Sequence, residues 1–338
     1  MPVQLPPYFL EDSPSEVRAQ GQPYHLGDAQ MDRHWLYTDG GAGITVGICD
    51  TGIDASHPEF AGKQIQGETF VGRRQVRGYE DGHGHGTHVA GIVAGGSVGV
   101  APHADLLIAK VLGDNGSGSN QGVAEGIDWL RENGADVINL SLGGPHDDPR
   151  TREAIALCHQ AGVLVFAASG NERASRVGYP AVHCIAVGAV DRQLQLAYFS
   201  NRGSKLDLVG YGVSVYSAVP GGRYQRMSGT SMATPWVAGC FANRLSAELR
   251  HLGATRTTTP DDALKLETYT IDLGPAGRDR SYGRGFPDLD RGFYELLDDR
   301  TPPAPPTDSS VIIVHGAEHG GQLFGGATLR PIGGDVDP

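Results

Sequence analysis

The sequence has few cysteines, no long apolar run and no signal-peptide pattern at its start. The four cysteines stand far apart and form no CxxC pair, which argues against a zinc or redox site and is typical of buried free thiols in a reducing compartment; they are Cys49, Cys158, Cys184 and Cys240. No stretch approaches the roughly 20 apolar residues of a membrane helix. The first 20 residues lack the basic and apolar regions of a secretory leader. We therefore expect a cytoplasmic protein with no membrane partner.

Positive charge is also scarce. The 338 residues carry a formal net charge of −12, and no basic run is present that could neutralise phosphates, so a nucleic-acid partner is excluded. The hydrophobic fraction of 39% is normal for a globular protein with a large core. Nothing in the composition indicates an oligomeric state.

Short apolar runs alternate with amphipathic stretches from about residue 41 onward. This pattern predicts an α/β fold of three layers, in which helices cover both faces of a mostly parallel sheet. The strands are expected at 43–50, 104–112, 135–142, 163–169 and 184–190, and the helices at 86–95, 120–134, 148–162 and 233–253. In such sheets the working site lies beyond the carboxyl ends of the strands.

Proline-rich segments mark the predicted domain boundaries. Residues 1–20 contain several prolines and show no periodicity, so we expect an N-terminal extension outside the core. Residues 21–300 form the predicted catalytic domain. Residues 301–338 begin with a proline-rich linker and continue as a glycine-rich tail too short for a domain of its own.

Three histidines fall within six residues, in "GHGHGTHVAG". They could form a metal site, or one could be a base beside two bystanders. The HExxH arrangement of zinc enzymes is absent, and His85 and His88 are three residues apart where zinc pairs usually are four apart. We interpret His85 as the base, His88 as a hydrogen-bonded core residue and His83 as a residue on the solvent side.

An acidic residue ends the first predicted strand. Asp50 in "ITVGICDTG" lies where parallel sheets place catalytic groups, although it could simply cap the following turn. The letters DTG also occur in aspartic proteases, but those enzymes need a second such Asp to share a proton. The sequence has no second DTG or DSG.

A serine and an asparagine are the remaining candidate catalytic residues. Ser231 in "SGTSMATPWVAG" opens a predicted helix, where outward-pointing amides could hold an oxyanion; a serine N-cap is the simpler alternative. Asn171 in "AASGNE" follows a buried strand and could donate to the same oxyanion or only stabilise a turn. The order Asp, His, Asn, Ser predicts acyl transfer by a triad. An α/β-hydrolase would need another order and a GxSxG motif, which the Ser231 context lacks.

These motifs, with "CDTGIDASHPEF" and "INLSLGGP", closely resemble those of the subtilisin family of serine proteases over about residues 22–296. The resemblance implies that Asp50 orients His85, that His85 activates Ser231, and that Asn171 holds the oxyanion. It also implies two backbone edges along an extended peptide, Gly116-Ser117-Gly118 and Ser141-Leu142-Gly143. The pocket for the residue before the cleaved bond would be lined by Leu142, Gly144, Ala168 and Gly170, and its lack of charge favours apolar or aromatic side chains.

The departures from the family pattern concern metal and regulation. The loop that often binds calcium tightly is short, and Glu59 stands where an Asp ligand is common, so no metal site is predicted; Asp207 is a weak candidate for a second cation. The chemistry needs no cofactor. The segment "LPPYFLED" resembles the short inhibitory extension of intracellular subtilisins, which predicts a zymogen with Pro6, Pro7 and Tyr8 across the cleft.

The predicted function is that of a serine endopeptidase acting on peptide or protein substrates through an acyl-enzyme. Two alternatives remain open from the sequence. One is a maturation protease dedicated to one partner, and the other is a catalytically silent scaffold that binds peptides.

Overall fold

The computed structural model describes residues 2–10, 22–72, 78–255, 259 and 270–288. The chain divides into two compact units, Met1–Arg300 and Thr301–Pro338. All the described residues belong to the first unit, so the predicted linker and tail at 301–338 lie outside them, as do residues 11–20 of the predicted extension.

A seven-stranded sheet forms the centre of the first unit, in the order β10-β9-β8-β7-β3-β5-β4, and every pair of neighbouring strands is parallel. The strands are β3 (Thr45–Asp50), β4 (Ile65–Thr69), β5 (Asp105–Lys110), β7 (Val137–Leu140), β8 (Leu164–Ala168), β9 (Ile185–Val190) and β10 (Leu208–Tyr211). Strands β7, β8 and β9 are buried along their whole length, as expected for a sheet with both faces covered.

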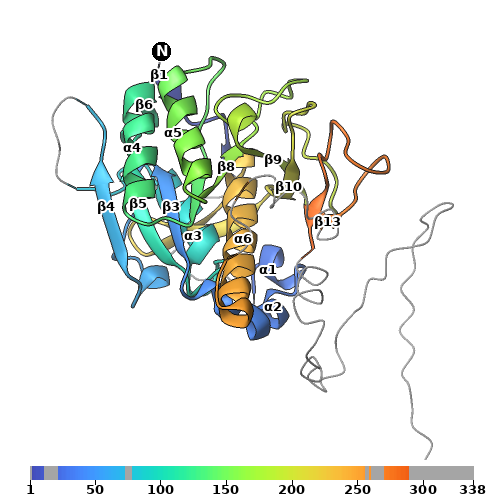
Figure 1. Cartoon of the computed structure of the whole chain (residues 1–338), viewed down its shortest axis with the longest axis horizontal. Helices are drawn as coiled ribbons and strands as arrows, with labels where there is room; N and C mark the ends of the chain where they lie inside the picture. Colours follow the sequence, from blue (N-terminus) through green and yellow to red (C-terminus); the bar gives the residue numbers. More distant parts are fainter. Residues whose placement is uncertain (1, 11–21, 73–77, 256–258, 260–269, 289–338) are drawn as a thin grey trace, which may run out of the picture. The chain divides into compact units, whose positions relative to one another are not determined.

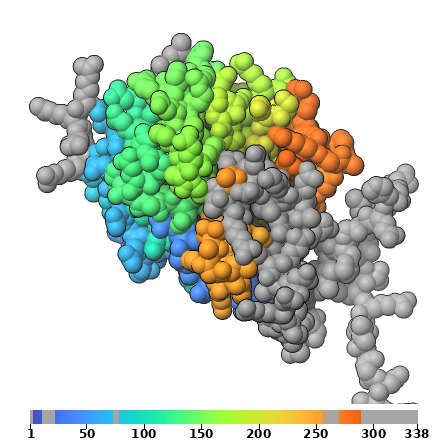
Figure 2. Space-filling model, in the orientation of Figure 1, coloured from blue at the N-terminus to red at the C-terminus, as the bar shows by residue number. Residues whose placement is uncertain are grey.

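Helices cover both faces of this sheet, so the structure has the predicted three-layer α/β architecture (Figure 1). The longer ones are α3 (His85–Ala94), α4 (Asn120–Glu132), α5 (Pro149–Gln160) and α6 (Thr230–Leu252), preceded by the short α1 (Tyr24–Gly27) and α2 (Met31–Thr38). Helices α4 and α5 pack against each other and form one continuous outer surface in Figure 2, while α3 and α6 pack together. None of the described helices is long and apolar enough to span a membrane.

Local chemistry sets the helix ends. The side chains of Ser119 and Asp148 accept hydrogen bonds from backbone amides in the first turns of α4 and α5. Helix α6 begins three residues earlier than predicted, at Thr230, so Pro235 lies inside the helix and not in its first turn. It ends at Gly253, whose φ of 75° is a left-handed conformation that glycine adopts readily.

Three small antiparallel sheets complete the described structure: β1 (Pro2–Gln4) with β6 (Ser117–Ser119); β2 (Phe9–Leu10) with β12 (Arg223–Ser228) and β11 (Val215–Val219); and β13 (Thr270–Ile271) with β14 (Phe286–Pro287). The described residues also form three single turns of 3-10 helix, at Asp39–Gly41, Pro58–Phe60 and Ala181–His183. The N-terminal segment therefore forms two short strands on the folded unit, β1 and β2, which the sequence did not predict within the extension.

The carboxyl ends of the central strands bring the predicted site residues to one edge of the sheet. Asp50 is the last residue of β3, Ser141 directly follows β7, and Asn171 follows the end of β8 by three residues. Because these strands are parallel neighbours or near neighbours, their ends meet at the same edge.

Candidate active site

Asp50 and His85 form a buried pair. The Nδ1 atom of His85 lies 2.8 Å and 3.0 Å from the two carboxylate oxygens of Asp50. Both side chains are 0% exposed. A proton on Nδ1 donates to the carboxylate, which leaves Nε2 of the neutral ring as a proton acceptor. This tautomer is the one that a general base needs.

The first turn of α3 positions the His85 ring. Gly84, the N-cap residue, has a φ of +105°, a backbone conformation that residues other than glycine rarely adopt. A Cβ atom on Gly86 would come within 2.2 Å of the carbonyl oxygen of Gly52. The turn that follows β3 can therefore lie against the start of α3 only because Gly86 has no side chain. The close approach brings His85 to Asp50.

Asp81 is a buried residue that the sequence analysis missed. Its carboxylate accepts hydrogen bonds from the hydroxyls of Thr51 and Thr87 and from the backbone amides of His83, Gly84 and Thr87. It therefore ties the turn after Asp50 to the start of the helix that carries His85. The sequence could have indicated this role, because Asp81 stands four residues before His85, just ahead of the predicted helix, where a carboxylate often accepts hydrogen bonds from the first backbone amides.

Ser231 lies at the second position of α6 and is fully buried in this structure. Its hydroxyl donates to the carbonyl oxygen of Ser141 at 3.3 Å. In return, the Ser141 hydroxyl donates to the Ser231 carbonyl at 2.8 Å. That carbonyl is available because Pro235, four residues on, has no N–H to complete the helical bond. The Nε2 atom of His85 is buried and has no hydrogen-bond partner among the described residues.

The Asn171 side chain has a fixed orientation. Its Oδ1 accepts from the Thr230 amide at 2.9 Å and from the Thr230 hydroxyl at 2.8 Å, so the amide nitrogen must face the opposite way. That nitrogen, Nδ2, donates to the carbonyl oxygen of Pro7 at 2.5 Å. A peptide carbonyl from the N-terminal segment is thus already held by Asn171.

The N-terminal segment runs between the two predicted backbone edges. Val3 pairs with Gly118 on β6, and the Leu5 amide donates to the carbonyl of Gly116 at 3.1 Å. On the other side, Gln4 and Gly143 exchange backbone hydrogen bonds of 3.4 Å and 3.1 Å. The segment therefore occupies a groove as an added strand, a common way of binding extended peptides.

Tyr8 covers the His85 ring. Their ring centroids are 5.1 Å apart, and the Tyr8 centroid lies 6.2 Å from that of His83. Burial raises the pKa of the Tyr8 hydroxyl, with the Asp50 and Asp81 charges adding to the effect. His83 is only half-buried beside Tyr8, whereas His85 is fully buried, and burial lowers the pKa of His83. His88 is a buried core residue, as predicted, and its Nε2 lies 3.0 Å from the carbonyl oxygen of Gln225.

Comparison with known proteins assigns the family. The model of the subtilase family (peptidase S8) matches residues 41–285. Subtilisin E of Bacillus subtilis (strain 168) is 40% identical over 291 residues, which cover 82% of this chain and 73% of that protein. Subtilisin DY of Bacillus licheniformis is 43% identical over 239 residues (68% and 86%), and an intracellular serine protease of Paenibacillus polymyxa is 41% identical over 251 residues (69% and 76%). The chain belongs to the subtilase family. It is a serine endopeptidase, as the family assignment requires.

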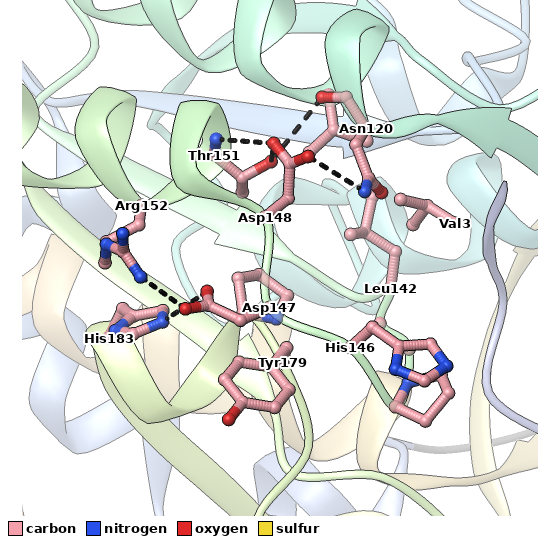
Figure 3. A pocket seen from close by; sticks show the side chains of 15 residues that line it. Val3, Asn120, Leu142, His146, Asp147, Asp148, Thr151, Arg152, Tyr179 and His183 are labelled. Carbon is pink, nitrogen blue, oxygen red and sulfur yellow. Dashed lines mark hydrogen bonds and ion pairs between the residues drawn. The ribbon is translucent and has the colours of Figure 1, made fainter. Parts of the chain in front are cut away.

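A hollow beside the groove lies under Val3 (Figure 3). Leu142, Gly143 and Gly144 line it, so two of the four residues predicted to form the subtilase pocket, Leu142 and Gly144, are found here, whereas Ala168 and Gly170 are not among its lining. On its far side Asp147 pairs with Arg152 and with Nε2 of His183, as Figure 3 shows.

Asp148 also lies beside this hollow, but its carboxylate is occupied by the first turn of α5. It accepts from the amide of Thr151 at 3.2 Å and from Nδ2 of Asn120 at 3.1 Å. Burial opposes ionisation of Asp148, but hydrogen bonds from Arg150, Thr151 and Asn120 outweigh it and lower its pKa to about 2. The charged residues around the hollow, Asp147 and Asp148, are therefore already paired within the protein.

The residues at the loop that binds calcium tightly in many subtilases do not fit a metal ion. Both carboxylate oxygens of Glu59 already accept hydrogen bonds, Oε2 from the Ser97 amide at 2.7 Å and Oε1 from the hydroxyls of Ser97 and Tyr224. The weak candidate Asp207 does not fit either, because its carboxylate accepts from Arg278 at 2.8 Å and from the Ala186 amide at 2.9 Å. Across the described ranges, no three His, Cys, Asp or Glu side chains gather as a metal-binding group.

Proposed function

We propose that this subtilase hydrolyses peptide bonds through Asp50, His85 and Ser231, with Asn171 as an oxyanion donor. The observation that supports this most directly is that Asn171 Nδ2 donates to the carbonyl of Pro7 in a peptide segment lying along the groove. A donor that holds a peptide carbonyl at this place also suits the oxyanion that forms when the carbonyl is attacked. The Ser231 amide, in the first turn of α6, is the proposed second donor.

The proposed steps use one chemical property of each group. Nε2 of His85 takes the proton of the Ser231 hydroxyl as its oxygen bonds to the carbonyl carbon of the substrate. The negative charge moves to the carbonyl oxygen, and Asp50 stabilises the imidazolium through Nδ1. The same proton then passes to the leaving nitrogen as the C–N bond breaks, which gives an acyl-enzyme. Water hydrolyses it by the same route in reverse.

The substrates are peptides or proteins in extended form. The backbone pairings that Val3, Gln4 and Leu5 make with the two edges would be made by the residues before the cleaved bond. The charged side chains around the neighbouring hollow are already paired within the protein, which supports a preference for uncharged, apolar or aromatic residues on this side. A panel of peptides that differ before the cleaved bond tests it, and a strict requirement for Lys or Arg would contradict it.

The N-terminal segment is proposed to keep the enzyme inactive. Residues 2–10 occupy the groove, and Tyr8 covers His85. Pro6 and Pro7 have no amide hydrogen to offer the carbonyl of Ser141, and that carbonyl accepts the Ser231 hydroxyl instead. The nucleophile is then bonded away from its base, which suits a zymogen. Removal of residues 1–20 should raise activity, and equal activity before and after removal would argue against inhibition.

A location inside the cell is proposed on two grounds. One relative is named an intracellular serine protease, and the four cysteines of this chain are all free. Cell fractionation with an antibody tests the location, and recovery of the protein from the culture medium would contradict it.

Labelling with a serine-reactive fluorophosphonate tests the catalytic assignment. After removal of residues 1–20 the protein should be labelled, its Ser231→Ala variant should not, and its Ser204→Ala variant, at an exposed serine outside the proposed catalytic set, should be labelled like the unaltered sequence. Equal labelling of the Ser231→Ala protein would overturn the assignment. Digestion of casein then separates a general endopeptidase, which should degrade it, from a maturation protease dedicated to one partner.

A further inference from the structure

Two aromatic residues form a platform beside the groove, on the side of the leaving peptide. Tyr198 and Phe199 lie in the turn between β9 and β10, with ring centroids 5.3 Å apart in an edge-to-face arrangement. The ring of Phe9 rests on both, 5.8 Å from Tyr198 and 5.3 Å from Phe199. These distances lie in the range of favourable aromatic contacts.

The two platform residues differ sharply in burial. Phe199 is 3% exposed and belongs to the core, whereas Tyr198 is 69% exposed. Among the exposed large hydrophobic side chains of the described part, Tyr198 has the largest exposed fraction. Its ring contacts are with Phe9 and Phe199. The core therefore gives little reason for a tyrosine at this position, whereas a bound aromatic side chain gives a direct one.

Strand pairing fixes which residue of a bound peptide meets the platform. Phe9 pairs with Ser228, the last residue of β12 and three residues before Ser231. The carbonyl held by Asn171 belongs to Pro7. Phe9 is thus the second residue after the carbonyl that occupies the oxyanion position.

The platform is held in a fixed position relative to the oxyanion donor. The amide of Arg173 donates to the Phe199 carbonyl at 2.8 Å, and the amide of Asn201 donates to the Gly170 carbonyl at 2.9 Å. These two bonds connect the platform turn to the loop on either side of Asn171. The distance from the oxyanion donor to the platform is therefore set by the protein and not by the occupant.

We propose that Tyr198 and Phe199 form a subsite for an aromatic side chain at the second residue after the cleaved bond. The inference rests on the proposed hydrolysis through Ser231 and adds a substrate class to it: polypeptides with Phe, Tyr or Trp at that position. In the full chain the same subsite is filled by Phe9, so inhibitor and substrate compete for it.

A competition assay measures the preference directly. Two quenched fluorescent peptides, identical except for Phe or Ala at the second residue after the cut, are mixed with the full-length protein. The ratio of their kcat/KM values does not depend on how many molecules have an open groove, because that fraction cancels. We expect the Phe peptide to be preferred by about three- to tenfold.

Variants assign the preference to the platform. Tyr198→Ala should reduce the ratio about threefold, Tyr198→Phe should keep it, and Leu36→Ala, an exposed apolar residue of α2, serves as the matched control. Equal cleavage of both peptides, or an undiminished ratio in Tyr198→Ala, would overturn the subsite. Absence of cleavage of both peptides, in the full-length protein and also after removal of residues 1–20, would instead count against the catalytic assignment.

A second measurement needs no catalysis. In a Ser231→Ala background, hydrogen exchange of the amides at residues 8–10 should be about threefold faster with Tyr198→Ala and unchanged with Tyr198→Phe, because the aromatic contact holds β2 on β12. Exchange that is the same in all three proteins would show that the platform does not bind an aromatic side chain.

Discussion

The hydroxyl of Ser231 is hydrogen-bonded to the backbone carbonyl of Ser141 while the Nε2 atom of His85 has no partner among the described residues. The nucleophile and the proposed base therefore share no hydrogen bond in the presence of a peptide segment whose Pro7 carbonyl is held by Asn171. A bound residue with an amide hydrogen could donate to that carbonyl and release the hydroxyl. This relationship leads to the first of five predictions.

Pro7→Ala should convert the N-terminal segment from an inhibitor into a substrate. The new amide hydrogen can compete for the Ser141 carbonyl, so the Ser231 hydroxyl becomes free to bond to His85. We expect cleavage after residue 7, seen by mass spectrometry, and higher activity on added peptides. Pro2→Ala, at the start of β1, is the control and should remain intact. An uncut, inactive Pro7→Ala protein would contradict the proposal.

Asn171→Leu should reduce kcat by about 10²–10³ with little change in KM. Leucine keeps the approximate volume but cannot donate to the oxyanion, which forms only during the reaction. Steady-state kinetics on a peptide substrate measure this split. A change confined to KM would mean that Asn171 binds the ground state and has no special role in catalysis.

Asp81→Asn should destabilise the fold by about 1.5–3 kcal/mol, because an amide nitrogen would replace an oxygen that now accepts from backbone amides and hydroxyls. Denaturant unfolding measures the loss. Asp128→Asn removes a partly exposed carboxylate that pairs with Arg131, and should cost at most about 1 kcal/mol. Similar losses in the two variants would refute the assignment of Asp81 as the residue that holds the start of α3.

Acid should destabilise the protein through two buried histidines. Burial lowers the pKa of His25 to about 4 and that of His88 to about 3, from an ordinary 6.5. Below pH 6.5 the unfolded chain takes up two protons at these residues that the folded chain does not. The free energy of unfolding should therefore fall as the pH falls from 6.5 towards 4, with a slope from these two groups that approaches about 2.7 kcal/mol per pH unit near pH 5.

His25→Gln provides the check on this slope. Glutamine can keep the hydrogen bond to the carbonyl of Val98 but cannot be protonated, so the contribution should drop to about 1.4 kcal/mol per unit. Chemical denaturation at several pH values measures both proteins. The same slope in both would show that His25 does not titrate as its burial implies.

Chelators should leave the melting temperature unchanged. Both oxygens of Glu59 accept hydrogen bonds from the protein, and Asp207 is paired with Arg278, so neither carboxylate needs a cation. Melting curves with a chelator and with excess calcium measure this. A saturable rise of the melting temperature with calcium would show a site that these contacts do not reveal.

The fold was predictable because its signals are local. Buried strands such as 185–190 are continuous apolar runs, and helices α4, α5 and α6 each have a capping residue at one end that can be read from the sequence, namely Ser119, Asp148 and Gly253. The sequence also placed Asp50 and Asn171 at the ends of strands, and the parallel sheet then brings them together. The strands β4 and β10 were missed, because their apolar pattern is short or interrupted by polar residues.

What was not predictable depends on contacts between distant segments. The Ser231 hydroxyl is hydrogen-bonded to the carbonyl of Ser141, which lies 90 residues away in the sequence. Tyr8 packs beside His83, which was expected on the solvent side. The pairing of Phe9 with Ser228 joins the two ends of the domain, and no local pattern specifies such a partner.

The N-terminal segment that we propose as an inhibitor belongs to the same chain as the groove that it occupies, which has a consequence for control. A short tether keeps the segment at an effective concentration in the millimolar range. Dilution of the protein cannot lower this value, and a free peptide must compete with it at every protein concentration. Permanent activation therefore requires a cut in the tether, after which the released piece is diluted into the surrounding volume and rebinding becomes negligible.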